Sequence, residues 1–102
     1  MMDITQEKWR ESIAKDADAV IIDVRTPEEI EEGQLSNARI INILDPDNFM
    51  KEVAKLDSSK NYYIYCRLGN RSGQACAVLN AQGIENTYNL LGGMIEWEGE
   101  LV

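Results

Sequence analysis

The sequence predicts an α/β domain built on a mainly parallel sheet of about five strands, with helices on both faces. Short apolar runs rich in β-branched and aromatic residues alternate with amphipathic stretches along the whole chain. The run 20–24 is apolar without alternation, which is typical of a strand covered on both faces. A length of 102 residues, with no repeat, low-complexity tract or long linker, predicts a single domain over residues 1–102.

The N-terminal elements are a helix over 6–15 and the strand over 20–24. Thr5 stands where an N-cap is expected, and Trp9 and Ile13 lie one helical turn apart on one face. These features predict that the helix packs on the sheet through its apolar side.

A capping box begins the next helix. Thr26 and Glu29 stand at the two ends of that box, and Pro27 takes the first helical position. The acidic cluster of Glu28, Glu29, Glu31 and Glu32 favours a solvated helix face. The elements expected after this helix are a strand over 40–43, a helix from Asp45-Pro46 with Phe49, Val53 and Leu56 on one face, a strand over 62–65, a helix over 72–82 ended by Gly83, a strand over 87–91, and a short helix carrying Met94 and Trp97.

A cysteine follows the most β-prone strand. The aromatic run 62–65 leads into Cys66, then a short loop, and the chain becomes helical from Ser72. Gly69 and Asn70 tolerate the left-handed backbone that a tight loop needs. The sequence therefore predicts a strand–loop–helix unit with Cys66 at the rim of its loop.

This setting favours the thiolate form of Cys66. The loop N–H groups of 67–72 can converge on the sulfur, the N-terminus of the helix points at it, and Arg67 and Arg71 add positive charge. A lone cysteine at a strand end is more often a small buried hydrophobe, so the loop carries the functional interpretation. Cys76, inside an apolar helix, is interpreted as a core residue.

Composition excludes several classes. The net charge of −8 disfavours nucleic acid and anionic membrane surfaces as partners. With no histidine and two cysteines we expect no metal, and no motif indicates a cofactor. No apolar run is long enough to span a membrane, and residues 1–5 show no signal-peptide pattern, so we expect a cytoplasmic protein unless a leader has been removed upstream.

Three blocks of residues, in order, resemble the single-domain rhodanese-like sulfurtransferases. Gln34 and Asn37 stand where that family usually has histidine and glycine, and both lie outside the active-site loop. The matching residues are Asp23-Val24-Arg25 with Glu29, Gly33-Gln34-Leu35 and Ala38; Tyr65-Cys66 with Gly69, Arg71, Ser72, Ala75 and Leu79; and Leu90, Gly92-Gly93 and Trp97.

The resemblance implies a sulfurtransferase of the thiosulfate type. The Cys66 thiolate takes a sulfane sulfur from thiosulfate or a persulfide donor, and a thiol or protein cysteine then accepts it from the Cys66 persulfide. The expected partners are thus a small anionic sulfur donor and a thiophilic acceptor. The residues expected to bind the substrate form the loop: Arg67, Leu68, Gly69, Asn70, Arg71 and Ser72.

The roles of the arginines stay open. Arg67 is slightly favoured for substrate contact, whereas Arg71 either binds substrate or pairs with Asp23, Glu29 or another carboxylate. Asp23 and Arg25 favour a structural ion pair.

Two other functions compete with sulfur transfer. Phosphatases that share this fold place five residues between cysteine and arginine, but only four separate Cys66 from Arg71. Non-catalytic binding modules of the same fold typically lack the cysteine. The loop therefore favours the enzyme over both alternatives.

Overall fold

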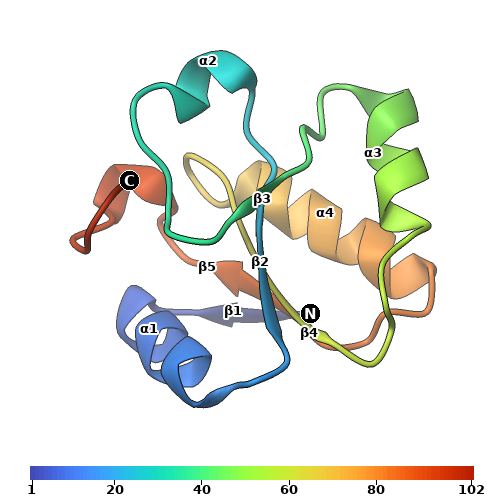
Figure 1. The fold of residues 1–102 in the computed structure, drawn as a ribbon, viewed down its shortest axis with the longest axis horizontal. Helices are drawn as coiled ribbons and strands as arrows, with labels where there is room; N and C mark the ends of the chain where they lie inside the picture. Colours follow the sequence, from blue (N-terminus) through green and yellow to red (C-terminus); the bar gives the residue numbers. More distant parts are fainter.

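The computed structural model describes residues 1–102 and contains a five-stranded sheet in the order β1-β5-β4-β2-β3 (Figure 1). All four neighbouring pairs are parallel, so every strand ends at the same edge of the sheet. This confirms the predicted α/β class. The strands are β1 (Met2–Ile4), β2 (Ala19–Asp23), β3 (Arg39–Ile40), β4 (Asn61–Tyr65) and β5 (Thr87–Leu90).

Helices cover both faces of the sheet, as predicted. Helix α1 (Gln6–Lys15) lies on one side, and α3 (Pro46–Val53) and α4 (Asn70–Ala81) lie on the other (Figure 1). The short helix α2 (Pro27–Ile30) and the 3-10 helix η1 (Met94–Glu96) follow the ends of β2 and β5. No helix combines the length and the apolar character needed to cross a membrane.

The alternation of β4 divides the core into two layers. Tyr62, Ile64 and Cys66 face the cluster formed with α3 and α4. Tyr63 and Tyr65 face α1, where each ring meets Trp9 edge to face at centroid distances of 5.6 and 6.1 Å. The central strand is therefore buried on both faces, and its C-terminal end lies in the middle of the sheet edge.

Local signals predicted the helix starts near the N-terminus. Thr5 caps α1, accepting a hydrogen bond from the Lys8 N–H, and Thr26 and Glu29 form the complete capping box of α2. Gly83 ends α4 with a positive φ of 91°, as expected.

Four elements differ from the prediction. Strand β1 was not expected, because three residues carry no periodic signal and β1 exists only by pairing with β5. The strand expected over 40–43 is regular only at Arg39–Ile40, although the N–H groups of Ile41 and Ile43 still donate to the carbonyls of Asp23 and Val24, because the Asn42 side chain closes a turn there. Helix α4 begins at Asn70 instead of Ser72, and the final helix is a single 3-10 turn.

Candidate active site

Cys66 lies directly after β4, beneath the loop that leads into α4. Its exposed fraction is 0%, whereas Arg67 and Leu68 above it are exposed. Cys66 lies where the strand meets the loop, as predicted, but its side chain continues the alternation of β4 and points into the core on the α4 side. The loop forms a cover over the sulfur.

Two groups contact the Cys66 sulfur. The Gly69 N–H donates to Sγ at 3.0 Å, and Ser72 Oγ lies 3.3 Å away. Gly69 has a φ of 108°, a conformation that favours glycine, and α4 starts at the next residue. Burial raises the pKa of the Cys66 thiol, but hydrogen bonds from Ser72 and from the N–H groups of Gly69 and Leu68 outweigh it, so the pKa lies below its ordinary value. This environment favours the nucleophilic thiolate.

The segment after β5 binds the backbone of the loop that follows Cys66. The Met94 N–H donates to the Cys66 carbonyl at 3.0 Å, and the Ile95 N–H donates to the Arg67 carbonyl at 3.1 Å. Gly93 has a φ of 58°, and a Cβ there would lie 2.8 Å from the Cys66 oxygen and overlap the Arg67 oxygen. Only glycine lets the two loops approach this closely.

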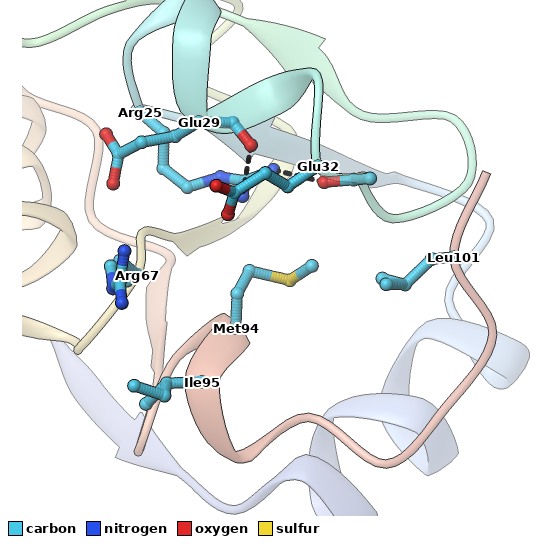
Figure 2. A pocket seen from close by; sticks show the side chains of 8 residues that line it. Arg25, Glu29, Glu32, Arg67, Met94, Ile95 and Leu101 are labelled. Atoms are coloured by element: carbon cyan, nitrogen blue, oxygen red, sulfur yellow. Dashed lines mark hydrogen bonds between the residues drawn. The ribbon is translucent and has the colours of Figure 1, made fainter.

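Arg67 has a free guanidinium, with no ion pair or side-chain hydrogen bond. It lines a pocket of about 170 Å³ beside the loop, together with Arg25, Glu32 and Met94. Figure 2 shows dashed hydrogen bonds from Arg25 and none from Arg67, which lies across the pocket from Leu101. A cation at a pocket wall with no protein partner is available to an anion.

Arg71 is paired instead. Its Nη1 and Nη2 each lie 2.7 Å from a carboxylate oxygen of Glu29, so α2 and α4 are joined by a two-pronged ion pair. These hydrogen bonds from Arg71 lower the pKa of Glu29 to about 2. Glu29 therefore departs from the solvated acidic face that the sequence predicted for this helix.

The Glu29 pair should make stability depend on pH in acid. A carboxyl whose folded pKa is depressed stabilises the protein above its ordinary pKa of 4.5, and the contribution is lost as the pH falls towards about 2. Glu29→Gln should therefore lower the free energy of unfolding at pH 7, and its difference from the wild type should shrink towards pH 2 in urea titrations. Glu28→Gln, at an exposed position without an ion pair, is the matched control. If Glu29→Gln lowered the free energy of unfolding equally at pH 7 and pH 2, the result would contradict a stabilising charge pair.

Asp23 and Arg25 form a second, deeper ion pair. Arg25 Nη2 lies 2.8 Å from Asp23 Oδ2, and both side chains are almost fully buried. Arg25 also donates to the carbonyls of Glu29 and Gly33, and the Tyr65 hydroxyl donates to Asp23 at 2.7 Å. The pair braces the α2 segment against the ends of β2 and β4, which fits the structural role that the sequence favoured.

Asn89 on β5 was not singled out from the sequence. Its side-chain oxygen accepts a hydrogen bond from Ser72 Oγ, and it is 5% exposed. A polar amide within a predicted buried strand is unusual, and that was the available signal. The contact itself joins residues 17 apart in the chain and requires the fold.

Cys76 lies on the buried face of α4, in the core cluster that also contains Cys66, and is fully buried. Burial raises the pKa of its thiol to about 11, so it stays protonated at neutral pH. Neither cysteine forms a disulfide, and no cluster of three potential metal ligands is present.

Comparison with known proteins agrees with this architecture. The family model for the rhodanese-like domain matches residues 5–100. A sulfurtransferase of Allochromatium vinosum is 37% identical over 95 residues, which are 93% of this chain and 86% of that protein. The crystal structure of a rhodanese-like domain protein from Staphylococcus aureus superposes with a TM-score of 0.86 at 32% identity, covering 100% of this chain and 97% of the other. A rhodanese-related protein from Thermoplasma volcanium gives 0.82 at 28%, covering 100% and 98%. With a match over nearly its whole length, the chain belongs to the rhodanese-like domain family.

Proposed function

We propose that this protein is a sulfurtransferase that moves a sulfane sulfur from an anionic donor such as thiosulfate to a thiol acceptor. The observation that carries the proposal is a cysteine with a lowered pKa, whose sulfur accepts a hydrogen bond from the Gly69 N–H, next to a pocket with an unpaired arginine. Cys66 supplies the thiolate, and Arg67 supplies the positive charge. The other loop residues shape the cover around the sulfur.

The first step is a displacement at sulfur. The Cys66 thiolate attacks the outer sulfur of thiosulfate and forms a new S–S bond, while the S–S bond of the donor breaks and its electron pair leaves with sulfite. The negative charge then resides on the outer sulfur of the persulfide. We expect loop N–H groups to stabilise this charge, and that of Gly69 already donates to the adjacent Cys66 Sγ.

The second step returns the nucleophile. A thiolate acceptor attacks the outer sulfur of the persulfide, and the Cys66 thiolate leaves. A low-molecular-weight thiol or a protein cysteine both supply the required chemistry. Both cysteines of this chain are free thiols, which fits a reducing compartment such as the cytoplasm.

Arg67 should determine preference for an anionic sulfur donor. A charge-assisted hydrogen bond contributes about 1.5–3 kcal/mol, so Arg67→Ala should lower kcat/KM for thiosulfate by about 10- to 150-fold. A sulfur donor without a charged sulfonate should be affected far less, since it makes no such contact. Steady-state kinetics with thiosulfate and with a neutral organic persulfide measures, for each donor, the ratio of kcat/KM between the wild type and the variant.

Arg39→Ala is the matched control, because Arg39 is exposed on the edge strand β3 and belongs to no ion pair. It should leave both ratios unchanged. Equal losses for both sulfur donors in Arg67→Ala would remove Arg67 from donor recognition. No sulfur transfer from any donor, combined with hydrolysis of a phosphate ester, would favour the phosphatase alternative.

A further inference from the structure

The Ser72 hydroxyl lies between the Cys66 sulfur and the side chain of Asn89. Ser72 Oγ is 3.3 Å from Cys66 Sγ and is also hydrogen-bonded to Asn89 Oδ1. All three residues are buried, with exposed fractions of 0%, 0% and 5%. The Ser72 side chain is shielded from water and has no other hydrogen-bond partner. Its single hydroxyl proton is therefore shared between these two neighbours.

The orientation of the Asn89 amide is fixed by its other contacts. Asn89 Nδ2 donates to Asp3 Oδ1 at 2.9 Å and to the Gly69 carbonyl at 3.0 Å. Both partners only accept, so a flipped amide would set oxygen against oxygen on both sides. The amide oxygen must therefore face Ser72, where it also can only accept.

When the Cys66 thiol is neutral, each donor and acceptor between Cys66, Ser72 and Asn89 has a partner. The thiol donates to Ser72 Oγ, and the Ser72 hydroxyl donates to Asn89 Oδ1. After ionisation the thiolate and Asn89 Oδ1 are both acceptors, and one hydroxyl proton remains for two of them. Donation to the sulfur leaves the buried amide oxygen without its partner, which is unfavourable.

We propose that Asn89 is a positioning residue of this site, which competes with the Cys66 thiolate for the single hydroxyl proton of Ser72. Asn89 thereby keeps the thiolate less strongly hydrogen-bonded and more nucleophilic. The inference rests on the proposed function only in taking Cys66 as the nucleophile. Through Asp3, it also connects the unpredicted strand β1 to the reacting sulfur.

Sulfur transfer relieves the competition. When the S–S bond forms, the negative charge moves from Cys66 Sγ to the outer sulfur of the persulfide. The inner sulfur no longer needs the hydroxyl proton, so Ser72 can donate to Asn89 again. The return of this proton favours the persulfide over the free thiolate.

A substitution of Asn89 leaves the other charged groups around the Cys66 sulfur in place. They are Arg67 in the loop, the Arg71–Glu29 pair of α4 and α2, the Arg25–Asp23 pair at β2, and Asp3 on β1. Asp3 is exposed and remains solvated without Asn89.

Asn89→Leu removes the competing acceptor and fills the same space. It should lower the pKa of Cys66 by about one pH unit, the size of one net hydrogen bond. The ionised thiolate should then react about threefold more slowly, because nucleophilicity falls with basicity. The pH dependence of alkylation by iodoacetamide measures both: its inflection gives the pKa of Cys66, and its plateau at high pH gives the rate constant of the thiolate. Asn89→Ala should also lower the pKa of Cys66 and the rate constant of its thiolate. It replaces Asn89→Leu in the experiment if the leucine variant does not fold.

The Ser72→Ala background separates this role from a merely structural one. Ser72→Ala alone should raise the pKa of Cys66, and adding Asn89→Ala should then change it no further, because Asn89 acts through the hydroxyl. Asn80→Leu is the matched control: the Asn80 amide likewise donates two hydrogen bonds through Nδ2, to the Ile84 carbonyl and the Thr87 hydroxyl, without touching Ser72. It should leave the pKa of Cys66 unchanged.

An unchanged or raised pKa of Cys66 in a folded Asn89 variant would overturn the inference, as would a shift that persists without the Ser72 hydroxyl. These readings use alkylation alone. They therefore stay distinct from a failure of the proposed function, which would show as an absence of persulfide in the wild type.

Discussion

Cys66→Ser is expected to abolish sulfur transfer and leave the fold intact. A serine oxygen can accept the same hydrogen bonds from Gly69 and Ser72, but it cannot form a persulfide. The turnover of thiosulfate should fall to the rate of the uncatalysed mixture, while the circular dichroism spectrum and melting temperature stay close to the wild type.

Cys76→Ser is the matched control for Cys66. It changes the same atom at an equally buried site of the same core layer, where the thiol is protonated. It should keep most of the activity with a modest loss of stability. Retained transfer in a folded Cys66→Ser protein would contradict the assignment, and an arrest of Cys76→Ser after one sulfur would give Cys76 a resolving role.

Arg25→Leu should produce a large loss of stability. It leaves the Asp23 carboxylate, which is 0% exposed, without its cation in the core. Removing one partner of a buried ion pair costs about 3–5 kcal/mol. For a domain of this size the melting temperature should fall by roughly 15 °C or more, as measured by calorimetry.

Two comparisons isolate the charge. Lys60→Met breaks the exposed ion pair between Lys60 and Asp18 and should change stability by less than about 1 kcal/mol. Adding Asp23→Asn to Arg25→Leu should recover part of the loss, because the uncompensated charge is gone. A stability of Arg25→Leu within about 1 kcal/mol of the wild type would show that the pair does not brace the site.

The sequence predicts those features of this fold that depend on neighbouring residues. The capping box of Thr26 and Glu29 and the apolar residues of β2 before Asp23 each lie within a few positions and were interpreted correctly. Cys66 could be placed at the end of β4 because aromatic and β-branched residues mark that strand so clearly.

The rest depends on contacts between distant segments. Strand β1 becomes regular only through its register with β5. The pairing of Glu29 with Arg71 stayed one of several alternatives, because the two residues lie 42 positions apart. The depth of Cys66 was missed, because its cover is held by backbone hydrogen bonds from Met94 and Ile95, which no side-chain pattern reports.

The most direct test of sulfur transfer through Cys66 is the mass of the intact protein before and after treatment with thiosulfate and removal of the sulfur donor. We predict a gain of one sulfur atom per chain, carried by the peptide that contains Cys66, and its loss on addition of cyanide. The same treatment should leave Cys66→Ser unchanged. No gain in mass, or a gain located on Cys76, would contradict the proposed mechanism.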